Sequence, residues 1–199
     1  ILIVLAHRFP GLVAGLEEAG HGHQAEMPLQ PGAAVGQLFT HRLGPGVHRG
    51  VVLVARLHLS LRHHPIAGDQ RLPPASLTKL MTMILMLESY QDQLDTISIT
   101  APGYIYDYLY GKNASTADIW KDETHTLRSL LYAMLLPSAN EAAYIVADYM
   151  SGSSIDNFVA MMNDEAARIG CTGTTFTDPC GLDPGNVTTA RDAYLLVRV

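Results

Sequence analysis

Apolar residues recur at helical spacing in several stretches of the chain beyond residue 69. The first stretch follows Pro73 and Pro74, and its apolar positions share one face of a helix. These positions are Leu77, Leu80, Met81, Ile84 and Leu85. Because proline lacks the N–H that a first helical turn leaves unpaired, the two prolines fit the beginning of a helix here.

A strand and a second helix are predicted next. Residues 96–100 alternate between polar and apolar side chains, which predicts a short strand. Leucine and methionine then recur at helical spacing from 127 to 135. We expect Thr124 or Thr126 to cap this helix and Pro137 to end it, because proline disfavours helical geometry in the residue before it.

Three further segments have a helical pattern. Small apolar residues over 142–147 predict a tightly packed helix, and residues 151–154 then break and recap the chain. A longer helix is predicted over 155–169, with Gly170 as its stop signal. The last residues, 194–199, have the apolar character of a helix still in progress.

Composition divides the chain near Gly68. Residues 1–68 contain no Lys, Asn, Asp or Tyr, hold eight of the nine histidines, and show no sustained helical or strand periodicity. We interpret this segment as disordered or as a wrong-frame or misjoined translation of GC-rich DNA; a genuine N-terminal domain is the alternative. Residues 69–199 instead have the pattern of an ordinary globular domain.

Charge and hydropathy argue against several functions. The net charge of −6 and the lack of basic runs disfavour a nucleic-acid surface. No apolar stretch approaches the ~20 residues of a membrane-spanning helix, and the run 1–6 is too short for a signal-peptide core. The histidine pairs at 21/23 and 63/64 match no standard zinc spacing, so we predict no metal site.

The first candidate for chemistry is Ser76, with Lys79 three residues later. Residues at i and i+3 lie on one helix face, so the amine can reach the hydroxyl. Apolar neighbours lower the pKa of a lysine, which would make Lys79 a base for a Ser76 nucleophile. The helix dipole would favour negative charge developing at its N-terminus. Alone, a serine at this position is more often only a helix cap.

The second candidate is the turn Ser138-Ala139-Asn140 between two predicted apolar helices. A turn pinned in this way holds its polar side chains rigidly. The Ser138 hydroxyl can relay a proton, and the Asn140 amide can bind both the lysine and a substrate carbonyl. The alternative is that Ser138 or Asn140 merely caps the following helix.

Together these motifs resemble the penicillin-binding and serine β-lactamase superfamily. The closer resemblance is to D-alanyl-D-alanine carboxypeptidases and covers roughly Asp69 to the C-terminus. It rests on residues 73–82, 135–143, 181–183 and 189–192, with similar residues at 115–117 and 123–124. The resemblance implies an α/β (α+β) transpeptidase-like fold, represented mainly by its helical part, with 69–199 as a partial catalytic domain.

The resemblance also implies an activity. Ser76 would form an acyl-enzyme with peptidoglycan stem peptides, Lys79 would be the base, Ser138 would pass a proton to the leaving group, and Asn140 would bind substrate. β-Lactam antibiotics would acylate the same serine. No metal or organic cofactor is implied, and the implied location is extracytoplasmic. Membrane association through a part beyond Val199 is left open.

Two departures from the family pattern qualify these expectations. The third motif, Lys-Thr-Gly or Lys-Ser-Gly, is absent, so we expect it beyond Val199 and expect little turnover from the chain as it stands. The strands that the family places before the first motif are not recognisable in 1–68. We therefore expect a sheet that is incomplete at both ends.

Two alternative functions remain open at this point. A class A β-lactamase would share Ser76, Lys79 and a Ser-x-Asn motif, but Ala139 stands where that class typically has Asp, and Glu165 does not resemble its deacylating glutamate. A non-catalytic penicillin-binding module is the other alternative. Acylation of the serine by a penicillin, lost on Ser76→Ala, would support an acylating enzyme.

The two cysteines, Cys171 and Cys180, are close enough in sequence for a loop-closing disulfide, and the implied location would preserve one. Spacing alone does not decide between this bond and two buried thiols.

Overall fold

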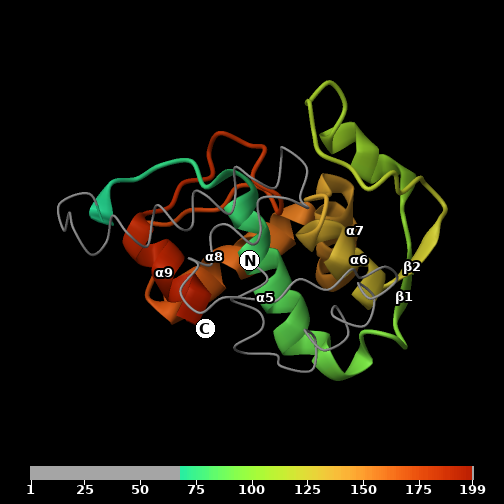
Figure 1. The fold of residues 1–199 in the computed structure, drawn as a ribbon, viewed down its shortest axis with the longest axis horizontal. Helices are drawn as coiled ribbons and strands as arrows, with labels where there is room; N and C mark the ends of the chain where they lie inside the picture. Colours follow the sequence, from blue (N-terminus) through green and yellow to red (C-terminus); the bar gives the residue numbers. More distant parts are fainter. Residues whose placement is uncertain (1–67, 199) are drawn as a thin grey trace, which may run out of the picture.

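A computed structural model describes residues 68–198 of the protein (Figure 1). The predictions for residues 1–67, including the histidine pairs and the origin of the N-terminal segment, lie outside the described residues. Within the described part, five helices surround a common apolar core, and a small antiparallel sheet lies at one edge. The mixture of helices and strands agrees with the expected fold class.

Helix α5 (Lys79–Tyr90) is at the centre of this part. It follows directly on a 3₁₀ turn, η2 (Ala75–Thr78), and contacts α7, α8 and α9. The spacing of leucines predicted one buried face, yet every residue from 79 to 87 is buried. A helix that is covered on all sides carries apolar residues all round, and the methionines of α5 supply them.

Two of the other four helices have the predicted limits, whereas the remaining two begin earlier than predicted. Helix α6 spans Leu127–Leu135, α7 spans Asn140–Ser151, α8 spans Ile155–Ile169 and α9 spans Ala190–Arg198. Thr126 caps α6 by accepting a hydrogen bond from the Ser129 N–H, and Ser154 caps α8 in the same way. Gly170 ends α8 with a left-handed φ of 93°.

The sheet within 68–198 has two antiparallel strands, β1 (Ser98–Thr100) and β2 (Thr124–Thr126). Ile99 pairs with His125, and the flanking residues Ser98 and Thr100 pair with Thr126 and Thr124. The predicted strand over 96–100 is therefore confirmed in its second half. Short 3₁₀ turns follow α5 (η3, Gln91–Gln93) and β1 (η4, Gly103–Tyr108).

Both cysteines are buried free thiols in the structure. Cys171 lies beside α9, and Cys180 lies beside Asp178. Burial raises the pKa of Cys171 to about 11 and that of Cys180 to about 12. The disulfide that sequence spacing left open is therefore not formed. None of the helices in the described part is long and apolar enough to cross a bilayer.

Candidate active site

The structure brings all four residues singled out in the sequence to one place. Ser76 lies in the η2 turn and Lys79 is the first residue of α5. Ser138 comes from the α6–α7 connection, and Asn140 is the first residue of α7. The Lys79 Nζ lies 3.3 Å from the Ser76 Oγ and 3.3 Å from the Ser138 Oγ. The two hydroxyl oxygens lie 2.9 Å apart, and Asn140 Oδ1 lies 2.8 Å from Nζ.

Neither Ser138 nor Asn140 acts as a helix cap. The cap position of α7 is Ala139, which makes no side-chain capping bond. The Ser138 side chain bonds to Ser76 and Lys79, while that of Asn140 bonds to Lys79 and to the Ser115 carbonyl. The polar side chains of this turn therefore form hydrogen bonds with Lys79 and Ser76 and do not cap α7.

Two residues beside the reactive groups have left-handed backbone conformations. Ala75, immediately before Ser76, has φ 49°, and Ser138 has φ 63°. Such conformations are unfavourable for residues with a Cβ and persist only where the surroundings impose them. These two backbone conformations therefore help to fix the directions of the Ser76 and Ser138 hydroxyls. Both serine side chains are half-buried.

Lys79 is a buried amine with an unusual environment. Its side chain is 1% exposed, and burial lowers its pKa from 10.5 to about 8. The carboxylates of Asp178 and Glu141 oppose this shift by favouring the ammonium form. At a pH near 8 a substantial fraction of Lys79 is the neutral amine, which can accept a proton.

The four partners of Lys79 suit that neutral form. Asn140 Oδ1 and the Cys180 carbonyl, 3.1 Å away, only accept hydrogen bonds. A neutral amine has two N–H donors for these two acceptors, and its lone pair then faces the hydroxyls of Ser76 and Ser138. The site therefore holds a base directed at two hydroxyl groups.

A loop over 178–183 completes the surroundings of Lys79. The buried Asp178 carboxylate accepts hydrogen bonds from the backbone N–H groups of four consecutive residues, 180–183, at 2.5–2.9 Å. This arrangement curls the loop so that the Cys180 carbonyl faces Nζ. Thr82 of α5 fixes the same loop by donating to the Pro179 carbonyl at 2.6 Å.

Sequence reasoning did not identify Asp178 or the Cys180 carbonyl as parts of the site. The available signal was the Asp-Pro pair before Cys-Gly, because an aspartate often bonds the N–H groups that follow it in a turn. Glu165, weighed above as a deacylating residue, forms an ion pair with Arg168 on α8. Within the described residues, no cluster of three or more His, Cys, Asp or Glu side chains could hold a metal ion.

Comparisons with known proteins identify the family of the chain. A family model described as D-alanyl-D-alanine carboxypeptidase matches residues 66–199. The chain is 32% identical to the D-alanyl-D-alanine carboxypeptidase DacC of Escherichia coli and 30% identical to DacF of Bacillus subtilis. These alignments cover 65% and 66% of the chain, but 33% of each relative.

The fold has relatives among solved structures. The crystal structure of penicillin binding protein 6B from Escherichia coli superimposes with a TM-score of 0.61 at 29% sequence identity, over 66% of this chain and 43% of that one. The described part of the chain thus has part of the penicillin-binding protein fold. The fold and the family model therefore point to the same class of protein.

The chain belongs to the D-alanyl-D-alanine carboxypeptidase family. It spans about a third of the length of the curated relatives named above.

Proposed function

We propose that residues 69–199 carry the acylation centre of a serine-type D-alanyl-D-alanine carboxypeptidase that acts on peptidoglycan stem peptides. One observation carries the proposal: the buried Lys79 amine lies within 3.3 Å of the hydroxyls of both Ser76 and Ser138. A nucleophile, a base and a second hydroxyl within hydrogen-bond reach are what acyl transfer with proton relay requires. Membership of the carboxypeptidase family supplies the substrate class.

In the acylation step, the neutral Lys79 amine accepts the Ser76 hydroxyl proton while Ser76 Oγ bonds to the carbonyl carbon of the penultimate D-alanine. The tetrahedral intermediate collapses as the C–N bond to the terminal D-alanine breaks. The leaving nitrogen takes a proton from Ser138, which Lys79 replaces from its ammonium group. Water then hydrolyses the Ser76 ester, releasing the shortened peptide and regenerating the free hydroxyl.

Asn140 has two roles in this scheme. It holds Lys79 through its amide oxygen at 2.8 Å, and by the family resemblance it also binds the amide of the acyl chain. The Ser76 backbone N–H supplies one donor for the oxyanion, at the N-terminal end of the helical segment where the dipole favours negative charge. The family resemblance assigns the second donor to a Lys-Thr-Gly strand, a motif that this sequence does not contain.

The same site accounts for reaction with β-lactams, whose strained amide takes the place of the scissile bond. A substrate in the cell wall places the protein on the outer side of the cytoplasmic membrane. The acidic net charge gives no reason to expect nucleic acid among its partners.

Release of D-alanine tests the proposed function. The full gene product that contains this chain is incubated with a peptide ending in D-Ala-D-Ala. We expect D-alanine to accumulate, Ser76→Ala and Lys79→Met to abolish its release, and Ser98→Ala, which alters an exposed serine on β1, to have no effect. Release that survives Ser76→Ala in the folded protein would overturn the proposal.

A further inference from the structure

A buried acid, Glu141, directly follows Asn140 in the first turn of α7. Its side chain is 2% exposed. One carboxylate oxygen, Oε1, accepts hydrogen bonds from the backbone N–H of Ala117 at 2.7 Å and of Ile119 at 3.5 Å. The other oxygen, Oε2, has no hydrogen-bond partner among the described residues. Burying a carboxylate is costly, so packing alone does not explain an acid here.

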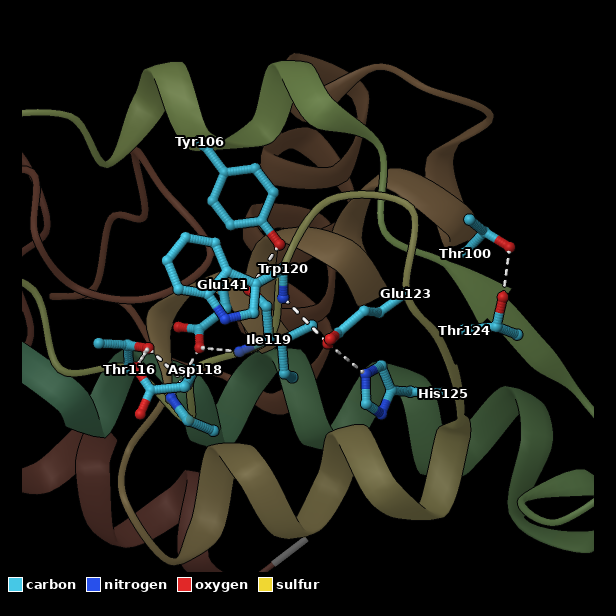
Figure 2. A network of polar contacts seen from close by, with 11 residues as sticks. Thr100, Tyr106, Thr116, Asp118, Ile119, Trp120, Glu123, Thr124, His125 and Glu141 are labelled. Atoms are coloured by element: carbon cyan, nitrogen blue, oxygen red, sulfur yellow. Dashed lines mark hydrogen bonds and ion pairs between the residues drawn. The ribbon is translucent and has the colours of Figure 1, made fainter.

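The segment that Glu141 holds, residues 115–119, has neither helical nor strand structure. Figure 2 shows the Glu141 side chain directed at this segment, with the Tyr106 hydroxyl approaching it from η4. The Tyr106 hydroxyl donates to the Ile119 carbonyl at 2.8 Å. Since the segment lacks regular hydrogen bonds of its own, contacts with Glu141 and Tyr106 fix its position beside α7.

The other end of the segment contacts the reactive cluster. The Ser115 carbonyl accepts one hydrogen bond from the Asn140 backbone N–H and another from Asn140 Nδ2, both at 2.9 Å. An amide whose NH₂ group is bound on one side must present its oxygen on the other, which is where Lys79 lies. The position of the Ser115 carbonyl therefore decides how Asn140 faces Lys79.

We propose that Glu141 is a positioning residue for Lys79: it clamps residues 115–119 against α7, so that the Ser115 carbonyl keeps the Asn140 amide oxygen directed at the amine. The significance of this clamp for catalysis rests on the proposed function, whereas the clamp itself is independent of substrate. Two neighbouring residues of α7 would thus have different roles: Asn140 contacts Lys79, and Glu141 fixes the orientation of Asn140.

The charge of Glu141 adds a second effect on Lys79. Three groups act electrostatically on the amine: Cys180 and Asp178 from the 178–183 loop, and Glu141 from α7. Burial lowers the pKa of Lys79 to about 8, and the two carboxylates keep it from falling further. The Cys180 thiol has its pKa raised to about 12 and is neutral at lower pH, so it adds no charge there.

The three lysines of the chain make the proposal measurable by NMR. Lys112 and Lys121 are exposed, so in a lysine-labelled sample the signal that titrates near pH 8 belongs to Lys79. Hydrogen exchange of the Asn140 side-chain NH₂ and of the Ala117 N–H reports on the clamp in the same protein. Neither readout requires substrate or acylation, so failure of the proposed function would leave both intact.

Two variants separate the effect of the Glu141 hydrogen bonds from the effect of its negative charge. Glu141→Gln keeps a weaker, neutral acceptor and removes the charge; we expect the Lys79 pKa to fall below the wild-type value and the Ala117 N–H to exchange faster. Glu141→Ala removes both; we expect exchange of the Asn140 NH₂ to rise by about 10-fold or more, with a smaller rise in Glu141→Gln. Asp148→Asn, which alters another buried acid of α7, is the matched control and should leave Lys79 and Asn140 unchanged.

Acylation adds the functional readout. In the gene product that contains this chain, labelling by a fluorescent penicillin should slow between about 10- and 100-fold in Glu141→Ala, as expected when a base is misdirected by about 1 Å. Unchanged Asn140 exchange and an unchanged Lys79 titration in whichever Glu141 variant folds would overturn the proposal. Loss of stability alone, without either change, would assign Glu141 a purely structural role and would equally refute it.

Discussion

Replacing Gly181 with alanine should damage both stability and the site, because this glycine touches the turn that carries Ser76. A Cβ built on Gly181 would lie 1.9 Å from the Ala75 carbonyl oxygen and 2.9 Å from Thr78 Oγ1. The first of these atoms belongs to the backbone and cannot rotate away. Gly181 also has φ 91°, in the left-handed region that residues with a Cβ rarely adopt.

The magnitude follows from adding these two effects. A left-handed φ costs a non-glycine residue about 1–2 kcal/mol. Overpacking against fixed atoms adds about 1–3 kcal/mol, for a total loss of about 2–5 kcal/mol in the free energy of unfolding. Gly170 is the matched control, because its φ is 93° but a Cβ there would meet nothing within 4 Å. Gly170→Ala should therefore lose only the contribution of the left-handed φ to the free energy of unfolding, about 1–2 kcal/mol.

Urea unfolding followed by circular dichroism measures both losses in the same chain. We expect Gly181→Ala to lose about 1–3 kcal/mol more than Gly170→Ala. Moving the loop also moves the Cys180 carbonyl away from Lys79, so only Gly181→Ala should alter the Lys79 titration. Equal losses in the two variants, within about 0.5 kcal/mol, would refute the close approach of the 178–183 loop to the Ser76 turn.

Three further predictions follow from the described contacts. The pKa of Lys79 is lower in the folded chain, about 8, than its ordinary 10.5, so the unfolded state binds more protons at Lys79 between these values, and the Lys79 contribution to stability should rise by about 3 kcal/mol from pH 8 to 10.5. Urea titrations measure this contribution as the difference between wild type and Lys79→Met, because the raised pKa values of the buried thiols lower stability equally in both proteins over this pH range. Asp178→Asn replaces the charged acceptor of four N–H groups and should lower the free energy of unfolding by about 2–4 kcal/mol; a loss below 1 kcal/mol would contradict its role in the loop. Thr126→Ala removes the cap of α6 and should cost about 0.5–2 kcal/mol, whereas Thr116→Ala, which alters an exposed threonine outside any helix, should cost less.

Local signals predicted the helices well because capping is a local interaction. Helix α8 has the predicted limits, since Ser154 bonds a nitrogen three residues ahead and Gly170 supplies a left-handed end. The full burial of α5 did not follow from periodicity, because it depends on which elements cover the second face. Leu77 and its neighbours indicated one face, and the tertiary arrangement covers the other.

The candidate site was likewise predictable where it depends on local geometry, and was not predictable where it depends on the tertiary arrangement. Ser76 and Lys79 are three residues apart, so helical geometry alone brings them together. Ser138 lies 62 positions further along, and only the family resemblance connected it to them. Glu141 and Asp178 were missed as supports of the site because acidic residues usually lie on the surface, and their burial depends on backbone N–H groups that only the folded chain brings near.

The proposed mechanism requires Ser76 to be the nucleophile, and mapping the acylated residue tests this directly. The gene product that contains this chain is incubated with a penicillin above pH 8, digested, and examined by mass spectrometry for a peptide heavier by one β-lactam. We predict that the added mass lies on Ser76, that it is absent from Ser76→Ala, and that it forms more slowly as the pH falls below about 8, where Lys79 is protonated. A stoichiometric adduct on Ser138 or another residue, or no adduct in the folded protein, would contradict the account.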